Sequence, residues 1–476
     1  MNISDILSVS SFTWLWVLIL LLVCLYYLKT VKPLHHWEQQ GLKMAGRLLV
    51  LGDVVFGMSL CKDPYPEKLR QIYMDAGELR YIGYYEFLTP VLLIKSPDLI
   101  KQIFVKDAAK FGDRRIAFPD NFDEVFSKNL LYLKGQEWKD MRSFWNYVLS
   151  ATKVAKLYPL MNETAVSFVN NFSGEENEVI EINLKECIRK YICSFASSIY
   201  FGVNHDSSTK EAETFYDSAR NALSFIEAGQ WKIIRYSLTL ADTRLAKLCG
   251  FQSIMKKGAQ SYFVEHVRRG MKREKDENHR DDLIGFVVER QREEISDSSE
   301  VYIKKNRSKL TEIEIAAQLC IFLFSSLDGL AATIGYIMYE LAVNQDIQKK
   351  LRNEFAEICY DGVQPSYEDI NNQQYLDMVI SETMRKWPAA ALVDRVCTVP
   401  YTIHPSSPDE QPLHLKVGDT IAASIYGLHH DPKYFPNPTK FDPERFSEEN
   451  RDKINPSHTN LGALEPKAVM EENYLS

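Results

Sequence analysis

Hydrophobic and polar positions alternate with a helical period along most of the chain. Where apolar residues recur every three or four positions, the pattern predicts amphipathic helices. Such segments are residues 98–104, 138–145, 157–171, 183–201, 334–359 and 375–386. Residues 315–332 are apolar on nearly every face, which is typical of a helix buried at the centre of a large protein, and this long helix is expected to span residues 311–341. Thr311 and Glu314 have the spacing of a capping box at its start.

Strand patterns are few and short. Residues 81–95 are rich in aromatic and β-branched residues around a Thr-Pro break, which predicts two strands of a hairpin. A second strand-like region spans residues 401–421. Residues 270–308 carry dense charge and are predicted to be a solvated helix and surface loop. The expected fold class is therefore mainly α with a small β-sheet region.

The N-terminal segment differs from the rest of the chain. Residues 12–28 contain no charge and have aromatic residues near both ends, which is typical of a membrane-spanning helix. Asp5 precedes this run, whereas Lys29 and Lys32 follow it. Because positive flanks stay in the cytosol, residues 1–30 are predicted to anchor a cytosol-facing body. A cleaved signal peptide is disfavoured, since neither a basic start nor a small-residue cleavage site is present.

Composition narrows the function classes. The chain has 476 residues, of which 45% are hydrophobic and 25% are charged, as in a globular protein. A net charge of -8 argues against nucleic acid as a partner. The eight cysteines are scattered and form no C-x-x-C pair. That spread fits reduced thiols in a cytosol-facing body better than a disulfide framework.

Two motifs in the last third of the chain carry the clearest chemical signal. Glu382 and Arg385 are three residues apart on a predicted helix, so their side chains share a face and can pair. Arg445 follows in the sequence Phe-Asp-Pro-Glu-Arg-Phe and can join them as a third charge. Each motif alone is common. In this order and at this spacing they resemble the cytochrome P450 superfamily of haem-thiolate monooxygenases, where this network supports the haem loop.

Other residues extend the resemblance to most of the chain. Trp138 and Arg142 lie four apart on one helical face and match the family's haem-propionate contacts, and Arg395 resembles a third. On their own, Trp138 and Arg142 would be read as a core tryptophan beside a surface arginine. Residues 83–94 and 111–115 resemble the insect microsomal branch of the family.

That branch implies a haem cofactor, location in the endoplasmic reticulum membrane and a membrane-bound flavoprotein reductase as electron donor. It also implies oxidation of lipophilic endogenous compounds or xenobiotics. Residues 108–130 and the helix face around Phe324 are apolar and aromatic. We expect them to shape a pocket for a lipophilic small-molecule substrate.

The oxygen-activation motif departs from the family pattern. Asp328 matches the family's acid, but Gly329 stands where the family has a threonine. Ser325 and Ser326 replace the usual small pair. The simplest interpretation of Asp328 is a buried acid satisfied by its helix, and that of Thr333 is a packed or back-bonded helix residue. By resemblance, oxygen activation is expected to be impaired.

The cysteine that would hold the iron is missing as well. In the family, a Phe-x-x-Gly-x-x-x-Cys-x-Gly loop follows the second motif, but no cysteine follows Cys397 in this sequence. The thiolate ligand favours cleavage of the O–O bond of iron-bound oxygen. Without it, we expect this step of oxygen activation to be lost. His458 comes too early to replace it. The sequence predicts an incomplete catalytic domain at residues 31–456 and an aberrant tail at 457–476.

A reading-frame slip offers an explanation for the tail. Shifted by one base, the Met470–Glu471 junction must encode glycine, and the Ala468–Val469 junction can encode cysteine. The shifted frame permits the missing loop, and sequencing the transcript across the Ile454 codon tests this hypothesis. Two alternatives to an impaired monooxygenase stay open. One is a membrane-tethered, non-catalytic lipophile-binding protein, and the other is a non-functional truncated or frameshifted product.

Overall fold

A computed structural model describes residues 16–17, 20–21, 35–45, 64–86, 89–115, 123–172, 180–203, 210–222, 255–275, 280–296, 309–359 and 364–451. The chain divides into two compact units. We call them the sheet unit (Met1–Arg115, Ala390–Thr439 and Ile454–Glu465) and the helical unit (Ile116–Ala389, Lys440–Lys453 and Pro466–Ser476). The predicted tail, and the predicted anchor apart from four residues, lie outside the described residues. The fold is mainly helical with a small sheet region, as expected.

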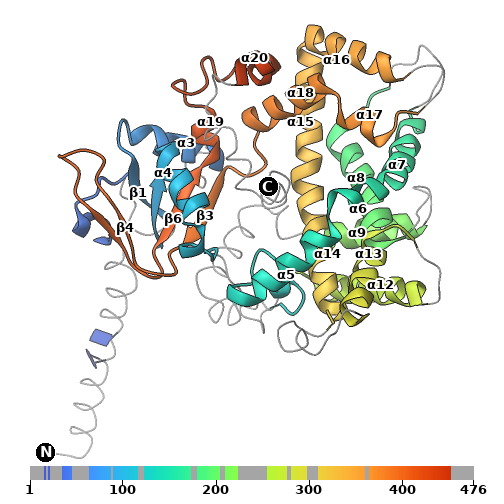
Figure 1. Cartoon of the computed structure of the whole chain (residues 1–476), viewed down its shortest axis with the longest axis horizontal. Helices are drawn as coiled ribbons and strands as arrows, with labels where there is room; N and C mark the ends of the chain where they lie inside the picture. The colour runs from blue at the N-terminus through green and yellow to red at the C-terminus, as the bar shows by residue number, and fades with distance from the viewer. Residues whose placement is uncertain are drawn as a thin grey trace, which may run out of the picture. The chain divides into compact units, whose positions relative to one another are not determined.

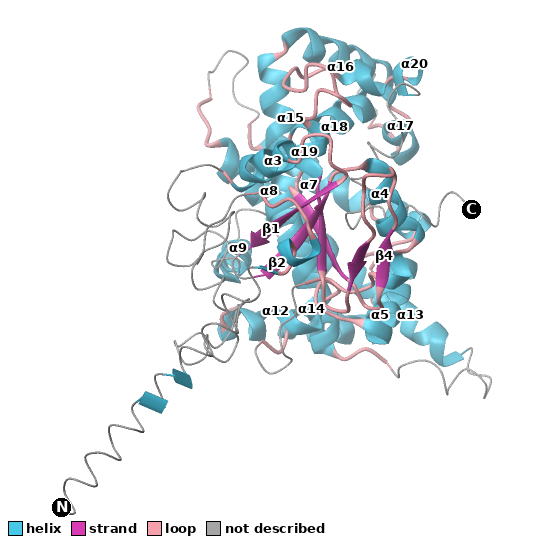
Figure 2. Cartoon of the chain, turned by 90° about the vertical axis from the view of Figure 1, so that its left-hand side faces the viewer, coloured by secondary structure: helices cyan, strands magenta, loops and turns pink. Residues whose placement is uncertain are grey.

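The sheet unit is built on a four-stranded sheet of order β1-β2-β6-β3. The hairpin is confirmed: β1 pairs antiparallel with β2, β2 pairs parallel with β6, and β3 pairs antiparallel with β6. A separate antiparallel pair, β4 with β5, accounts for much of the predicted 401–421 region. Figure 2 shows both sheets in magenta. The strands are β1 (Tyr81–Glu86), β2 (Thr89–Ile94), β3 (Leu392–Val396), β4 (Tyr401–Ile403), β5 (Leu413–Leu415) and β6 (Thr420–Ser424).

Short helices cover this sheet and enclose one apolar core. Residues of β1, β2 and β6 that alternate on the two sheet faces are almost all buried, so both faces are covered. Ser96 caps the first helix after β2 by accepting a hydrogen bond from the Leu99 amide at 3.4 Å. The helical segments are η3 (Glu38–Gln40), α3 (Tyr65–Asp75), α4 (Pro97–Lys101), η4 (Gln102–Lys106), η5 (Ala108–Lys110) and α19 (Ile425–His429).

The helical unit packs its helices around a second apolar core. The predicted helices near 138–145, 157–171, 183–201 and 375–386 are all present. Its members are η6 (Phe126–Lys128), α5 (Gly135–Val148), α6 (Ala151–Lys156), α7 (Tyr158–Asn170), α8 (Leu184–Phe201), α9 (Lys210–Ala222), α12 (Lys257–Lys275), α13 (Leu283–Ser296), α14 (Glu312–Ser325), η7 (Ser326–Leu330), α15 (Ala331–Val343), α16 (Gln345–Ile358), α17 (Tyr367–Asn371), α18 (Gln374–Lys386), η8 (Pro443–Phe446) and α20 (Glu448–Arg451).

The central helix runs through this unit as α14, the π-helical turn η7, and α15 (Figure 1). The predicted capping box is present, with both the Thr311 and the Glu314 side chains bonded across it. Glu312–Val343 is long and apolar enough to cross a membrane, yet two-thirds of its most apolar stretch is buried, as in a core helix. The exception is one face of α15, where Tyr339 and Val343 are 53% and 62% exposed.

Two sequence predictions in this unit were wrong. Residues 334–343 do not begin a new helix; they continue the central one, which ends at Val343 with Asn344 as its cap. The Asn344 side chain donates to the Glu340 carbonyl at 2.9 Å, a local bond that competes with helix propagation. The polar segment is not wholly solvated either. Within it, α13 buries apolar residues such as Phe286, and the buried Asp282 is paired with Arg273 at 2.6 Å.

Candidate functional site

Glu382 and Arg385 form a buried ion pair on α18. The Arg385 guanidinium donates to both carboxylate oxygens of Glu382, at 2.6 and 2.9 Å. Glu382 is fully buried and Arg385 is 2% exposed. A bidentate arginine–carboxylate pair fixes both direction and distance. The pairing predicted from the three-residue spacing is therefore confirmed.

Glu382 also fixes a segment that lies some sixty residues later. The Asp442 amide donates to Glu382 Oε1 at 2.9 Å, and Arg445 Nε of η8 lies 3.4 Å from the same oxygen. Arg385 Nη2 reaches the Lys440 carbonyl at 3.5 Å. One carboxylate thus holds two guanidinium groups and a backbone amide. A buried network of this kind determines geometry more than it adds stability.

Glu340 joins the end of α18 to the central helix, and the sequence reading missed it. Its carboxylate accepts from Trp387 Nε1 at 2.8 Å and pairs with Lys386 Nζ at 2.8 Å. The Trp387 ring stacks on Tyr336, with ring centres 4.6 Å apart and planes 2° apart. The available signal was a single acid in an otherwise apolar helix, because buried acids are normally paired.

Trp138 and Arg142 lie on one face of α5, as their four-residue spacing predicted. Both side chains are half-buried. Met141, Trp145 and Val148, which follow at helical spacing on the adjoining side of α5, are buried. The helix therefore anchors itself in the core and leaves Trp138 and Arg142 at its margin, where a ligand carboxylate can meet the guanidinium.

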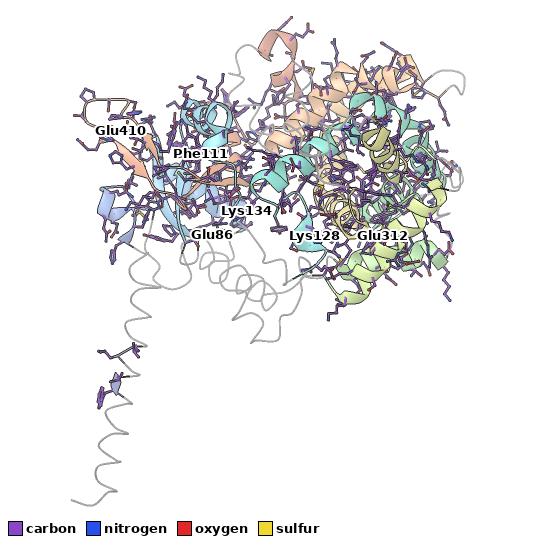
Figure 3. The ribbon with its side chains drawn as sticks, turned by 60° about the horizontal axis from the view of Figure 1, so that its bottom comes forward. Glu86, Phe111, Lys128, Lys134, Glu312 and Glu410 are labelled. Atoms are coloured by element: carbon purple, nitrogen blue, oxygen red, sulfur yellow. The ribbon has the colours of Figure 1, made fainter. Side chains whose placement is uncertain are left out.

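Arg395 lies on β3 of the sheet unit, in a setting that favours an anion. Burial and the nearby Arg114 lower the pKa of Arg395 to about 10. Its guanidinium donates to the Asp394 carbonyl at 2.8 Å, whereas the Asp394 carboxylate lies 3.3 Å from Arg115. Arg115 in turn donates to Glu86, labelled in Figure 3, at 2.7 Å. Sequence reasoning did not identify this Arg115 bridge.

Arg395→Met is expected to raise the free energy of unfolding by about 1 to 2 kcal/mol when no anion is bound. A lowered pKa in a base means that the folded state disfavours the charged form, so removing the charge relieves that cost. Urea denaturation of both proteins measures the change. Arg80→Met is the control, since Arg80 pairs with Glu410 at 2.9 Å and its loss should not stabilise the fold. Equal effects of the two substitutions would contradict the interpretation of Arg395.

Asp328 occupies the π-helical turn η7 and is exposed, so the interpretation as a buried acid was wrong. An exposed carboxylate at this position can exchange protons. A Cβ at Gly329 would lie 3.7 Å from the Ala389 Cβ, an ordinary van der Waals contact, so a Cβ could be accepted there. Thr333 Oγ1 donates to the Gly329 carbonyl at 3.0 Å, which confirms the back-bonded reading. Its hydroxyl is committed to its own helix.

Three buried cysteines in the described part of the chain, Cys193, Cys320 and Cys397, do not fit a thiolate ligand. Burial raises the pKa of Cys193 to about 12 and also raises the pKa of Cys320 and Cys397. Buried apolar surroundings favour the neutral thiol, whereas metal ligation needs the thiolate. Cys397 is further engaged, donating to the Val399 carbonyl at 2.8 Å. Arg142 and Arg395 suit the carboxylate groups of a ligand, but these three thiols do not suit iron.

Comparisons with known proteins point to one family. The family model described as "Cytochrome P450" matches residues 65–462. The chain is 30% identical over 438 residues to "Probable cytochrome P450 9f2" of Drosophila melanogaster, covering 88% of this chain and 82% of that protein. It is 29% identical over 467 residues to "Cytochrome P450 9e2" of Blattella germanica, covering 93% and 85%. It is also 29% identical to mouse "Cytochrome P450 3A25" over 377 residues, covering 79% and 71%.

Proposed function

Because the chain belongs to the cytochrome P450 family of haem monooxygenases, we propose that its fold serves the oxidation of lipophilic endogenous compounds or xenobiotics. Oxygen is the oxidant, and a membrane-bound flavoprotein reductase supplies the electrons. When bound, haem supplies the iron at which oxygen is activated. The observation that carries the proposal is the buried network of Glu382, Arg385 and Arg445.

The residues divide into three roles in this proposal. Glu382, Arg385 and Arg445 hold the segment that precedes the family's haem loop. Trp138, Arg142 and Arg395 hold the haem propionates, and the lowered pKa of Arg395 supports its part in this set. Asp328 exchanges protons with solvent beside the oxygen site. We assign no step through the iron, because the buried thiols of Cys193, Cys320 and Cys397 do not suit its ligation.

We further propose that a chain of this sequence is an impaired monooxygenase. No cysteine follows Cys397, and Gly329 stands where the family has a threonine. A Cβ at Gly329 would make only an ordinary contact with Ala389 among the described residues, which supports loss of a side chain at this position. The retained ion-pair network favours recent loss over long non-catalytic drift. A one-base slip upstream of residue 457 accounts for the cysteine, and the transcript across the Ile454 codon tests that origin.

The proposed location is the endoplasmic reticulum membrane, with the body in the cytosol. Residues 1–30 would form the anchor and residues 31–456 the catalytic domain. The uncharged residues 12–28 and the lysines after them support this arrangement. A second candidate is a membrane-tethered protein that binds lipophiles without oxidising them. The buried ion-pair network of Glu382, Arg385 and Arg445, which the sequence keeps beside the missing thiolate, supports this candidate.

The reduced carbon-monoxide difference spectrum of the chain in membranes tests the impairment. We expect no strongly red-shifted Soret band, because that band requires a thiolate on the iron. The Blattella germanica 9e2 protein, expressed in the same membranes, controls for haem supply. A red-shifted band from this chain would show that one of its cysteines ligates iron and would overturn the impairment. Extraction of bound lipophiles from the purified chain then tests the second candidate.

A further inference from the structure

A pair of hydroxyl groups joins α8 to the π-helical turn of the central helix. The Tyr200 hydroxyl and Ser326 Oγ lie 2.7 Å apart. Ser326 is 6% exposed, and α8 packs along α14, η7 and α15. A hydrogen bond in such a setting is costly to lose, because the remaining hydroxyl stays buried without its partner.

The neighbouring hydroxyls on the central helix behave differently. Ser325 Oγ donates to the Ile321 carbonyl at 2.9 Å, and Thr333 Oγ1 donates to the Gly329 carbonyl at 3.0 Å. Both bonds stay within the helix, so neither ties the turn to another element. Of these three hydroxyls, Ser326 is the one that reaches a different helix.

The Tyr200 ring is itself fixed by aromatic packing. Its centre lies 6.0 Å from that of Phe195 and 6.3 Å from that of Phe322, with the rings in edge-to-face arrangements. Such contacts restrict the ring beyond simple burial. The hydroxyl is therefore presented to Ser326 from a fixed position.

The turn that receives this bond needs support from outside. A π-helical turn is a rare departure from regular helix and often occurs at functional sites. Gly329 adds a cost of about 1 kcal/mol relative to alanine inside a helix. Asp328 lies two residues after Ser326, so any movement of the turn moves its carboxylate.

We propose that Tyr200 and Ser326 are positioning residues, whose hydroxyl pair holds the π-helical turn and thereby sets the place of Asp328. The assignment rests on the proposed role of Asp328. Neither residue touches the reacting atoms. The serine that replaces one of the family's small residues thus has a function in this chain.

Hydrogen exchange followed by mass spectrometry tests this proposal on the chain without haem. In Tyr200→Phe, peptides covering residues 326–331 should exchange about fivefold faster, the effect of losing one hydrogen bond. Ser326→Ala should give the same increase. The double substitution should add little to either, since both remove one shared bond. Ser326→Thr keeps a hydroxyl and should restore slow exchange.

Tyr216→Phe is the matched control. The Tyr216 hydroxyl donates to Glu186 at the other end of α8 at 2.7 Å, so its loss should leave residues 326–331 unchanged. Unchanged exchange in both Tyr200→Phe and Ser326→Ala would overturn the proposal, as would an equal rise throughout α13 and α16. If Tyr200→Phe does not fold, Ser326→Ala removes the same bond by deleting one oxygen. None of these outcomes depends on haem binding or turnover, so they are separate from the test of the monooxygenase function.

Discussion

Glu382→Ala is expected to lower the free energy of unfolding by about 3 to 5 kcal/mol, because it removes one partner of a buried ion-pair network. Arg385, at 2% exposure, would keep its charge with no carboxylate to balance it. Arg445 and the Asp442 amide would lose the same acceptor. Urea denaturation followed by circular dichroism measures the loss.

Glu444→Ala provides the control for that experiment. Glu444 is the neighbour of Arg445 and pairs with Lys350, but both side chains are about half exposed. An exposed pair contributes under about 1 kcal/mol. If Glu382→Ala and Glu444→Ala cost the same, the network does not determine the geometry of this region, and the assigned role of Glu382 fails.

Gln318→Leu is expected to lower the free energy of unfolding by about 2 to 4 kcal/mol, the second large effect. Gln318 is fully buried on α14. Its amide donates to the Lys128 carbonyl at 2.7 Å and its carbonyl accepts from the Leu130 amide at 2.9 Å. Leucine has nearly the same size, so the loss would come from two unsatisfied backbone groups. Lys128 and Glu312, at the start of α14, are labelled in Figure 3.

Gln318→Leu should also free the segment around Lys128 for cleavage, since this glutamine fixes it to α14. Limited proteolysis should cut residues 123–133 at lower protease concentrations in the variant. Gln345→Leu is the control: Gln345 is exposed at the start of α16, and its amide donates to the Ala342 carbonyl at the end of α15, at 2.7 Å. If Gln318→Leu resists the protease as well as the unchanged chain does, other contacts hold residues 123–133, which include part of the predicted pocket wall.

Local patterns predicted much of the fold because they depend on near neighbours. The aromatic and β-branched run of β1 and β2, the capping box at Thr311 and the apolar period of α18 are all short-range signals. The parallel pairing of β2 with β6 is not, because it joins residues some 330 positions apart. The expected end of the central helix near residue 341 lies close to its observed end at Val343, but the apolar pattern continues past this point, and the next helix was wrongly predicted to begin at residue 334.

Prediction of the site from the sequence is likewise restricted to residues that are near neighbours in the chain. Glu382 and Arg385 share a helix, so their spacing alone predicted the pair. Arg115, which bridges Glu86 and Asp394, depends on three separate segments that only the tertiary fold brings together. The partner of Tyr200 was equally hidden, since serine in a helix usually bonds its own backbone.

The exposed face of α15 affects the amount of this protein that a cell can maintain. Tyr339 and Val343, with Tyr336 beside them, place an apolar stripe in water. Apolar patches on a folded surface invite association, and chaperones and proteases act continuously on chains that expose them. The steady-state amount of this chain would then be set by quality control rather than by synthesis, so a strong transcript would accompany little protein.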